Sequence, residues 1–163
     1  MAEFDTGDAL ASSDGASPNL SSDVVKQAYY EPEWLKKEYA ALWPRVWQVA
    51  CRVEELEHVG SYVTYDIGDE SVIVVRSSPE RIRAFYNVCQ HRGRRLIDGS
   101  GTTPNFACKF HGWRWNINGE NEHVTQVEDW HGALDGDDLC LNEVWLDTWG
   151  GWVFVTFDPD VAP

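Results

Sequence analysis

Short runs of apolar residues alternate with polar residues over most of the chain, starting near Trp47. These runs are rich in β-branched and aromatic residues and are separated by turns such as Gly68-Asp69, Ser78-Pro79 and Asn118-Gly119, a pattern that predicts β-strands. Many short strands joined by tight turns favour a mainly β protein, built as an antiparallel β-sandwich. The predicted strands are Trp47–Cys51, Tyr62–Ile67, Ser71–Arg76, Ile82–Val88, Asn105–Phe110, Trp113–Ile117, Leu141–Leu146 and Trp152–Phe157.

A helical pattern precedes the strands. Between Glu33 and Trp47, apolar residues recur at close to helical intervals, which predicts an N-terminal helix whose apolar face packs on the core, with packing on another domain as the alternative. Pro44 lies inside this run, so the helix is expected to kink or restart there. We therefore expect a disordered tail at residues 1–23, a helical lead-in at 24–47 and a β domain at 48–163.

Charge narrows the set of partners. The 163-residue chain has a formal net charge of −14, which argues against nucleic acid and anionic membranes as partners. No segment reaches the length of a transmembrane helix, and no basic residue precedes Lys26, so we expect a cytoplasmic protein without a secretory signal. Between Arg76 and Arg114, however, lie eight of the thirteen basic residues and only two acidic ones. This basic segment suits the docking of an acidic partner, and a solvated face with internal salt bridges is the alternative.

Two short loops mix cysteine with histidine: Cys89-Gln90-His91 and Cys108-Lys109-Phe110-His111, sixteen residues apart. Two irons bridged by sulfides need two ligands each, so Cys89 and Cys108 can ligate one iron while His91 and His111 ligate the other. This is the ligand set of a Rieske [2Fe–2S] centre, whose reduction potential is roughly −150 to +300 mV against about −400 mV for all-cysteine plant-type clusters. The loops thus predict a protein that transfers single electrons.

A tetrahedral zinc site is the competing interpretation, because zinc also takes four Cys and His ligands and spacing alone does not separate the two. The other two cysteines, Cys51 and Cys140, lie in apolar stretches and are expected to be buried free thiols; a disulfide between them is possible but unsupported.

Residues flanking the two loops also have expected roles. Gly93 and Gly112 allow tight turns that present backbone N–H groups to the cluster sulfurs. Trp113 either shields the cluster from water or packs in the core. Arg92, with Arg94 and Arg95, is either solvated or contacts a partner.

These residues resemble a known family. Asn87-Val88-Cys89-Gln90-His91-Arg92-Gly93 and Cys108-Lys109-Phe110-His111-Gly112-Trp113 are similar to the Rieske domain of ring-hydroxylating oxygenase large (α) subunits, and the similarity extends over roughly residues 28 to 158. The resemblance implies that a ferredoxin or flavin reductase delivers electrons to the cluster. They then pass to a mononuclear non-haem iron in the catalytic domain of the same or a neighbouring α subunit, which hydroxylates an aromatic or other apolar ring with O₂. Family members form trimers, with or without a small β subunit.

One departure from the family is large. The sequence stops at Pro163, where the resemblance places the start of the catalytic domain, so this chain alone is not expected to be catalytic. The only candidates for a 2-His-1-carboxylate site, His123, Asp129 and His131, are interpreted instead as exposed loop residues. A stand-alone Rieske-type ferredoxin is the alternative function. The helical lead-in and the end at Pro163 favour the oxygenase.

Overall fold

The computed structural model describes residues Lys26–Val161, so the predicted tail at 1–23 lies outside the described residues. The chain divides into two units, with the boundary between Leu35 and Lys36. The helical elements are η1 Lys26–Tyr29, α1 Pro32–Ala41, η2 Trp43–Arg45, η3 Val53–Leu56 and η4 Val127–Trp130. The strands are β1 Gln48–Arg52, β2 Ser61–Ile67, β3 Glu70–Ser78, β4 Arg81–Tyr86, β5 Ser100–Thr102, β6 Asn105–Ala107, β7 Arg114–Asn116, β8 Asn121–His123, β9 Trp145–Trp149 and β10 Trp152–Thr156.

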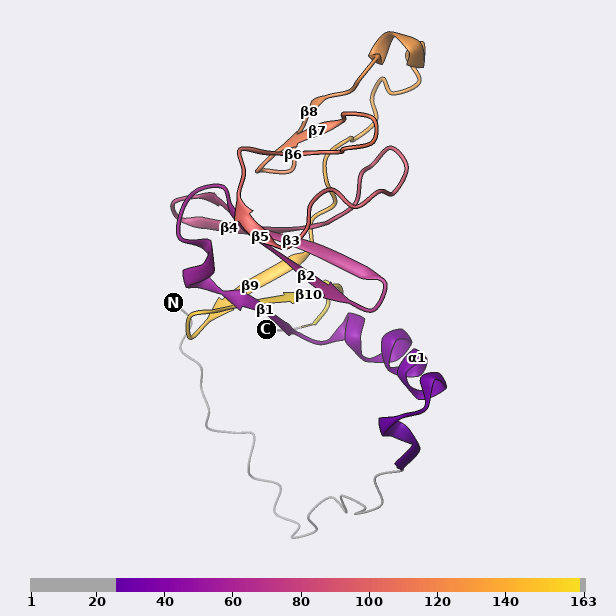
Figure 1. Cartoon of the computed structure of the whole chain (residues 1–163), viewed down its shortest axis with the longest axis vertical. Coiled ribbons are helices and arrows are strands. Elements are labelled where there is room, and N and C mark those ends of the chain that lie inside the picture. Colours follow the sequence, from indigo (N-terminus) through magenta and orange to yellow (C-terminus); the bar gives the residue numbers. More distant parts are fainter. Residues whose placement is uncertain (1–25, 162–163) are drawn as a thin grey trace. The chain divides into compact units, whose positions relative to one another are not determined.

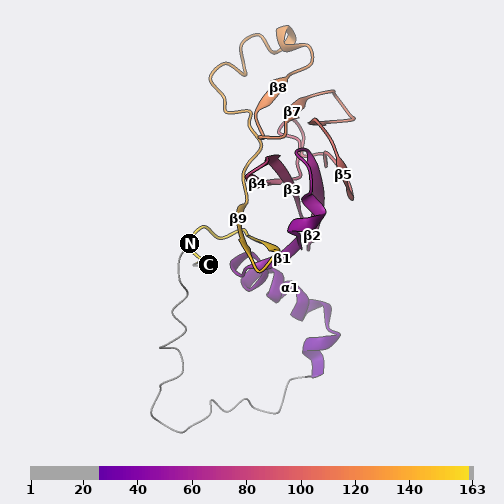
Figure 2. The same ribbon diagram turned by 90° about the vertical axis from the view of Figure 1, so that its left-hand side faces the viewer.

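The strands of the second unit form three antiparallel sheets, with the orders β1-β10-β9, β4-β3-β2-β5 and β6-β7-β8. The four-stranded sheet is the middle layer, with β7 and β8 on one side and β1 and β9 on the other (Figures 1 and 2). The predicted mainly β, antiparallel fold is therefore confirmed.

Strand β3 shows why the middle sheet organises the core. Val72 and Val74 point into one apolar cluster, together with Val153 and Val155 of β10. Ile73 and Val75 point into a second cluster, on the side of β6 and β7. Because successive side chains of a strand point to opposite faces, a strand buried on both faces reads as a continuous apolar run.

Most predicted strands are confirmed, with two corrections. The strand predicted over Asn105–Phe110 ends at Ala107, because the next residues turn away in a loop. The strand predicted over Leu141–Leu146 is only partly present: Glu143 makes a single bridge to Phe85, and β9 begins at Trp145. Strands β5 and β8 were not predicted, since they are three residues long and lack an apolar run.

The lead-in helix is shorter than predicted. It ends at Ala41, and the segment around Pro44 is a separate 3₁₀ turn, which agrees with the expected restart at that proline. The prediction that its apolar face packs on the core is wrong, because α1 has no buried residue and Leu35 and Leu42 are each 45% exposed. Both faces of the middle sheet contribute instead to two apolar clusters built by the strands.

The two remaining cysteines differ. Cys51 is buried, as expected, but Cys140 is exposed, because it follows a polar turn where its N–H donates to the Asp138 carboxylate (3.0 Å). Both are free thiols. Within the described residues, no helix is long and apolar enough to cross a membrane.

Thiol labelling tests this difference. Burial raises the pKa of Cys51 to about 12, and Asp138, by accepting a hydrogen bond from the thiol, raises the pKa of Cys140. Iodoacetamide at pH 8 should modify Cys140 about tenfold or more faster than Cys51, as followed by peptide mass spectrometry. Asp138→Asn should accelerate the reaction, because it lowers the Cys140 pKa. Equal labelling of both cysteines would contradict the structure.

Candidate metal centre

The first Cys/His loop closes as a tight turn after β4. The Cys89 N–H donates to the Arg94 carbonyl (2.8 Å), and the Gly93 N–H donates to the Cys89 carbonyl (2.9 Å). Gly93 has a φ of +69°, a left-handed conformation that glycine adopts without steric cost. The chain therefore reverses within six residues, as the glycine predicted.

The second loop, which follows β6, repeats this turn. The Cys108 N–H donates to the Trp113 carbonyl (2.8 Å), and the Gly112 N–H donates to the Cys108 carbonyl (3.0 Å). Gly112 has a φ of +76°, and a Cβ added there would lie 2.9 Å from the Thr125 hydroxyl oxygen. The two loops are thus two copies of one backbone turn, each with a cysteine at its base.

Backbone N–H groups of both turns point at the sulfurs. Those of His91 and Arg92 donate to the Cys89 sulfur, and those of Phe110 and His111 donate to the Cys108 sulfur. Such donors stabilise a thiolate or a thiolate bound to metal.

The two thiols are buried hydrogen-bonded neighbours, each 3% exposed. Burial raises the pKa of Cys89. Burial also opposes ionisation of Cys108, but the N–H groups at its sulfur and the Cys89 thiol together lower the Cys108 pKa. One sulfur of the pair is therefore poised to ionise first.

The two imidazoles form the second pair. The ring centroids of His91 and His111 lie 4.7 Å apart. His91 stacks on Trp113 (5.0 Å, 9°) and meets the edge of Trp130 (5.4 Å, 75°), so aromatic rings hold it on two sides. Burial lowers the pKa of His91, and His111 and Arg92 lower it further, which favours the neutral ring that a metal requires.

The donors are thus sorted by type across the two loops, sulfur with sulfur and imidazole with imidazole. Within residues 26–161, no three Cys, His, Asp or Glu side chains gather around one point. Two pairs of like donors fit a binuclear cluster in which one iron takes two sulfurs and the other takes two nitrogens.

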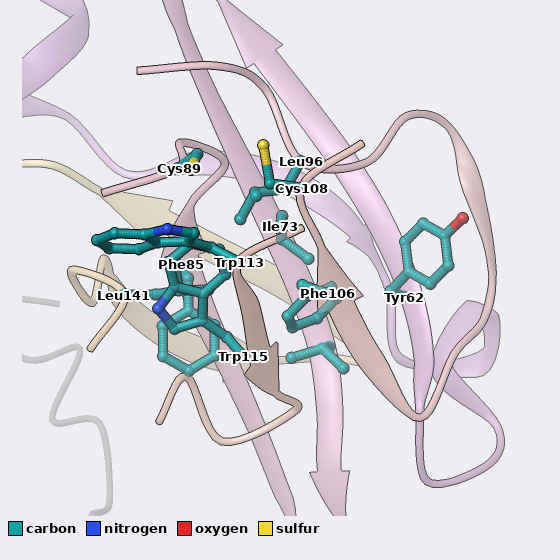
Figure 3. Packing of buried hydrophobic residues seen from close by; sticks show 11 residues of the cluster. Tyr62, Ile73, Phe85, Cys89, Leu96, Phe106, Cys108, Trp113, Trp115 and Leu141 are labelled. Carbon is teal, nitrogen blue, oxygen red and sulfur yellow. The ribbon is translucent and has the colours of Figure 1, made fainter. Parts of the chain in front are cut away.

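An apolar layer lies beneath the thiols. Trp113 and Trp115, 2% and 0% exposed, lie below Cys89 and Cys108 (Figure 3). The Trp115 indole donates to the Leu139 carbonyl (2.7 Å), so its buried N–H is satisfied. Trp113 therefore packs in the core, one of its two expected roles, and also stacks on His91, while the shielding of a cluster stays a prediction.

The imidazole side is open. A hollow of about 530 Å³ is lined by His91, His111, Phe110, Trp130 and Asp129, among others. Both histidines are half-buried, in contrast to the cysteines. The imidazole pair is therefore the more accessible side of the site.

Asn87 holds the base of the first loop, a role that sequence reasoning missed. Its buried side chain accepts hydrogen bonds from the N–H groups of Leu96 (3.1 Å) and Ile97 (3.2 Å). It also donates to the Ile97 carbonyl (2.7 Å) and the Ser71 hydroxyl (3.1 Å). It therefore ties together the chain entering and leaving the loop. The available signal was a polar residue two positions before a ligand.

Trp130 is a second residue that sequence reasoning missed. It belongs to η4, which is flanked by Gln126 and His131 in the left-handed conformation (φ 53° and 49°). Positive φ angles are uncommon for residues other than glycine. The turns that they form bring Trp130 against the His91 ring. The feature of the sequence that could have indicated this role is a single tryptophan within an otherwise polar segment between strands β8 and β9. His123, Asp129 and His131 are exposed, as expected, but His123 ends strand β8 rather than lying in a loop.

The arginines near the loops divide into two groups. Arg95 pairs with Asp66 (2.9 Å) and Asp98 (2.7 Å), which matches the expected internal salt bridges. Arg92, Arg94 and Lys109 are exposed and make no ion pair within the part of the chain that is described. Arg94 lies over the Phe110 ring (5.8 Å). Arg92 lines the hollow beside the two histidines, and Arg94 and Lys109 lie on the two Cys/His loops.

Paired thiols beside paired imidazoles, on two loops of an antiparallel β domain, are typical of mixed-ligand iron–sulfur proteins. Residues 46–140 match the family described as the Rieske [2Fe-2S] domain, a span of more than half the chain. The chain belongs to this family. Membership implies a [2Fe–2S] cluster, and the donor pairs described above suit that group.

Individual relatives are subunits of oxygenases. The chain is 31% identical over 148 residues to the carnitine monooxygenase oxygenase subunit of Escherichia coli K12, covering 90% of this chain and 39% of the relative. It is 33% identical over 133 residues to the large component of naphthalene 1,2-dioxygenase from Pseudomonas aeruginosa, covering 80% and 30%. The expected similarity to oxygenase large subunits is confirmed, and the chain spans well under half the length of these relatives.

Solved structures show the same fold. A naphthalene 1,2-dioxygenase variant bound to phenanthrene gives a TM-score of 0.74 at 34% identity, over 80% of this chain and 30% of the other. The Rhodococcus naphthalene 1,2-dioxygenase bound to indole gives 0.76 at 27% identity, over 83% and 31%.

Removal of the Asn87 side chain should loosen the first loop. Asn87→Ala leaves two buried N–H groups without an acceptor, so we expect a loss of about 2–4 kcal/mol in unfolding free energy. Cluster loss in a chelator, followed by visible bleaching, should accelerate. Ser71→Ala removes only one partner of Asn87 and should cost about 1 kcal/mol. The proposed role fails if Asn87→Ala bleaches no faster than Ser71→Ala.

Proposed function

We propose that the chain is the electron-transfer module of a Rieske oxygenase large subunit, with Cys89 and Cys108 on one iron and His91 and His111 on the other. The sorting of donors into a thiol pair and an imidazole pair carries this assignment. A bound [2Fe–2S] cluster supplies one-electron transfer. The flanking residues Arg92, Gly93, Gly112 and Trp113 shape the two loops and their surroundings.

Membership of an oxygenase, rather than a stand-alone ferredoxin, is supported by the relatives, which are oxygenase components. In this proposal, a ferredoxin or flavin reductase donates the electron. The electron then leaves for a mononuclear non-haem iron in the catalytic domain of the same or a neighbouring α subunit, where O₂-dependent hydroxylation takes place. The division into a lead-in at 24–47 and a Rieske domain at 48–163, and the cytoplasmic location, stay predictions.

Ligand substitution tests the iron assignment. The purified protein should contain two irons and two acid-labile sulfides per chain. His91→Cys and His111→Cys, as separate variants, should keep the cluster but lower its potential by on the order of 100 mV or more, because a thiolate adds negative charge to the second iron. His123→Cys, at an exposed histidine outside both loops, should leave the potential unchanged. Zinc without sulfide, or unchanged potentials in both ligand variants, would contradict the proposal.

Three cations that make no ion pair within the described part of the chain indicate where the electron donor docks. Arg92, Arg94 and Lys109 lie on the two ligand loops, while the chain as a whole is strongly acidic. The negative charge of most of the chain repels an acidic donor, whereas these three cations attract it. The donor is therefore oriented toward the imidazoles of His91 and His111. We therefore propose that the donor presents carboxylates around its own redox centre.

Charge reversal tests the docking proposal. In Arg94→Glu, the second-order rate of reduction by a reduced acidic [2Fe–2S] ferredoxin should fall about tenfold at low salt, and the difference should shrink at high salt. Arg81→Glu makes the same change of charge at an exposed position outside both loops and should have a much smaller effect. Stopped-flow spectroscopy measures both rates. Equal slowing in the two variants would mean that net charge, rather than the loop cations, governs association.

A further inference from the structure

A second hollow, of about 370 Å³, lies between the end of the lead-in and the β2–β3 turn, away from the thiols and imidazoles. Four aromatic side chains line it: Tyr39, Trp43, Tyr86 and Phe157. Tyr86 and Phe157 contact each other with ring centroids 5.6 Å apart. Aromatic walls of this kind bury the alkyl part of a ligand and attract cations to the ring faces.

Two elements fix one wall of the hollow. The Gln48 side chain donates to the Trp43 carbonyl (2.6 Å) and accepts from the Tyr65 hydroxyl (3.0 Å), which ties the 3₁₀ turn to strands β1 and β2. Tyr39 lies over Gly68, where an added Cβ would come within 3.0 Å of its ring. The aromatic wall is therefore part of the folded domain.

Two carboxylates stand at the rim. Asp69 and Glu70 line the same hollow and make no ion pair within residues 26–161. Glu70 lies close enough to Tyr86 to contribute, after burial, to raising the pKa of that phenol. The rim is thus anionic beside an aromatic interior, which complements a group that is apolar along its stem and positive at its end.

One donor in this wall is unsatisfied. The Trp43 indole N–H is buried and has no hydrogen-bond partner in the described structure. This nitrogen has almost no accessible surface, so it does not open into the hollow, and its NMR signal reports instead on the packing of the aromatic wall.

We propose that this hollow binds a lysine or arginine side chain of a partner polypeptide. The alkyl stem lies between the aromatic rings, and the cation reaches Asp69 and Glu70. The site is separate from the metal centre, so it serves assembly with another protein rather than the transfer of the electron itself.

The test uses the full chain with Nα-acetyl-lysine N-methylamide as probe, followed by the Trp43 indole N–H signal in ¹H–¹⁵N spectra. Loss of one signal in Trp43→Phe assigns it. The lysine probe should shift this signal with a dissociation constant in the millimolar range. The norleucine analogue, which has a similar stem without charge, should bind at least about fivefold more weakly.

Variants separate charge from shape. Asp69→Asn with Glu70→Gln should weaken the lysine probe about fivefold, while Glu80→Gln, at an exposed turn outside the hollow, should not. Equal binding of lysine and norleucine probes, no effect of the double substitution, or no shift of the indole signal would each overturn the proposal. Tighter binding of tetramethylammonium than of the lysine probe would also overturn it, in favour of a free cation.

Discussion

The structure depends on how it buries two sulfurs side by side. Cys89 and Cys108 are almost inaccessible and in contact, a position where two thiolates repel each other and both lose their hydration. Four backbone N–H groups directed at the sulfurs offset part of this cost, and positive metal ions between the loops would offset the rest. A pair of turns that presents amide groups to buried thiols is therefore the feature that the surrounding fold has to support.

The fold supplies that support from below. The middle sheet is covered on both faces, so strands β3 and β4 are held rigidly, and the first loop follows directly from β4. Asn87 closes the base of that loop with four hydrogen bonds, which keeps the entering and leaving chain together. The second loop follows β6 and rests on Trp113 and Trp115. Each turn is thus anchored to a strand on one side and to buried rings beneath.

Local patterns in the sequence predicted much of this arrangement. Alternating apolar residues located the long strands, and the glycines after each ligand pair predicted the turns. Features that depend on distant contacts were not predictable: Asn87 matters because Leu96 and Ile97 return to it, and Trp130 matters because a polar segment folds over His91. Cys140 was predicted to be buried from its apolar neighbours, but the preceding turn exposes it. Short polar strands such as β5 and β8 form only because a neighbouring strand pairs with them.

The two loops share a backbone but place their histidines differently, and this asymmetry shapes the surface around the site. The histidine is two residues after the cysteine in the first loop and three residues after it in the second. Equivalent positions are therefore His91 and Phe110, and Arg92 and His111. The residue of each pair that is not histidine is exposed, so one loop leaves a cation and the other an aromatic ring beside the imidazole edge. Arg94, lying over Phe110, joins these two features into one surface. Because the two imidazoles come from two copies of one turn and lie 4.7 Å apart, the same geometry that pairs them also leaves a cation and an aromatic ring exposed on the two loops.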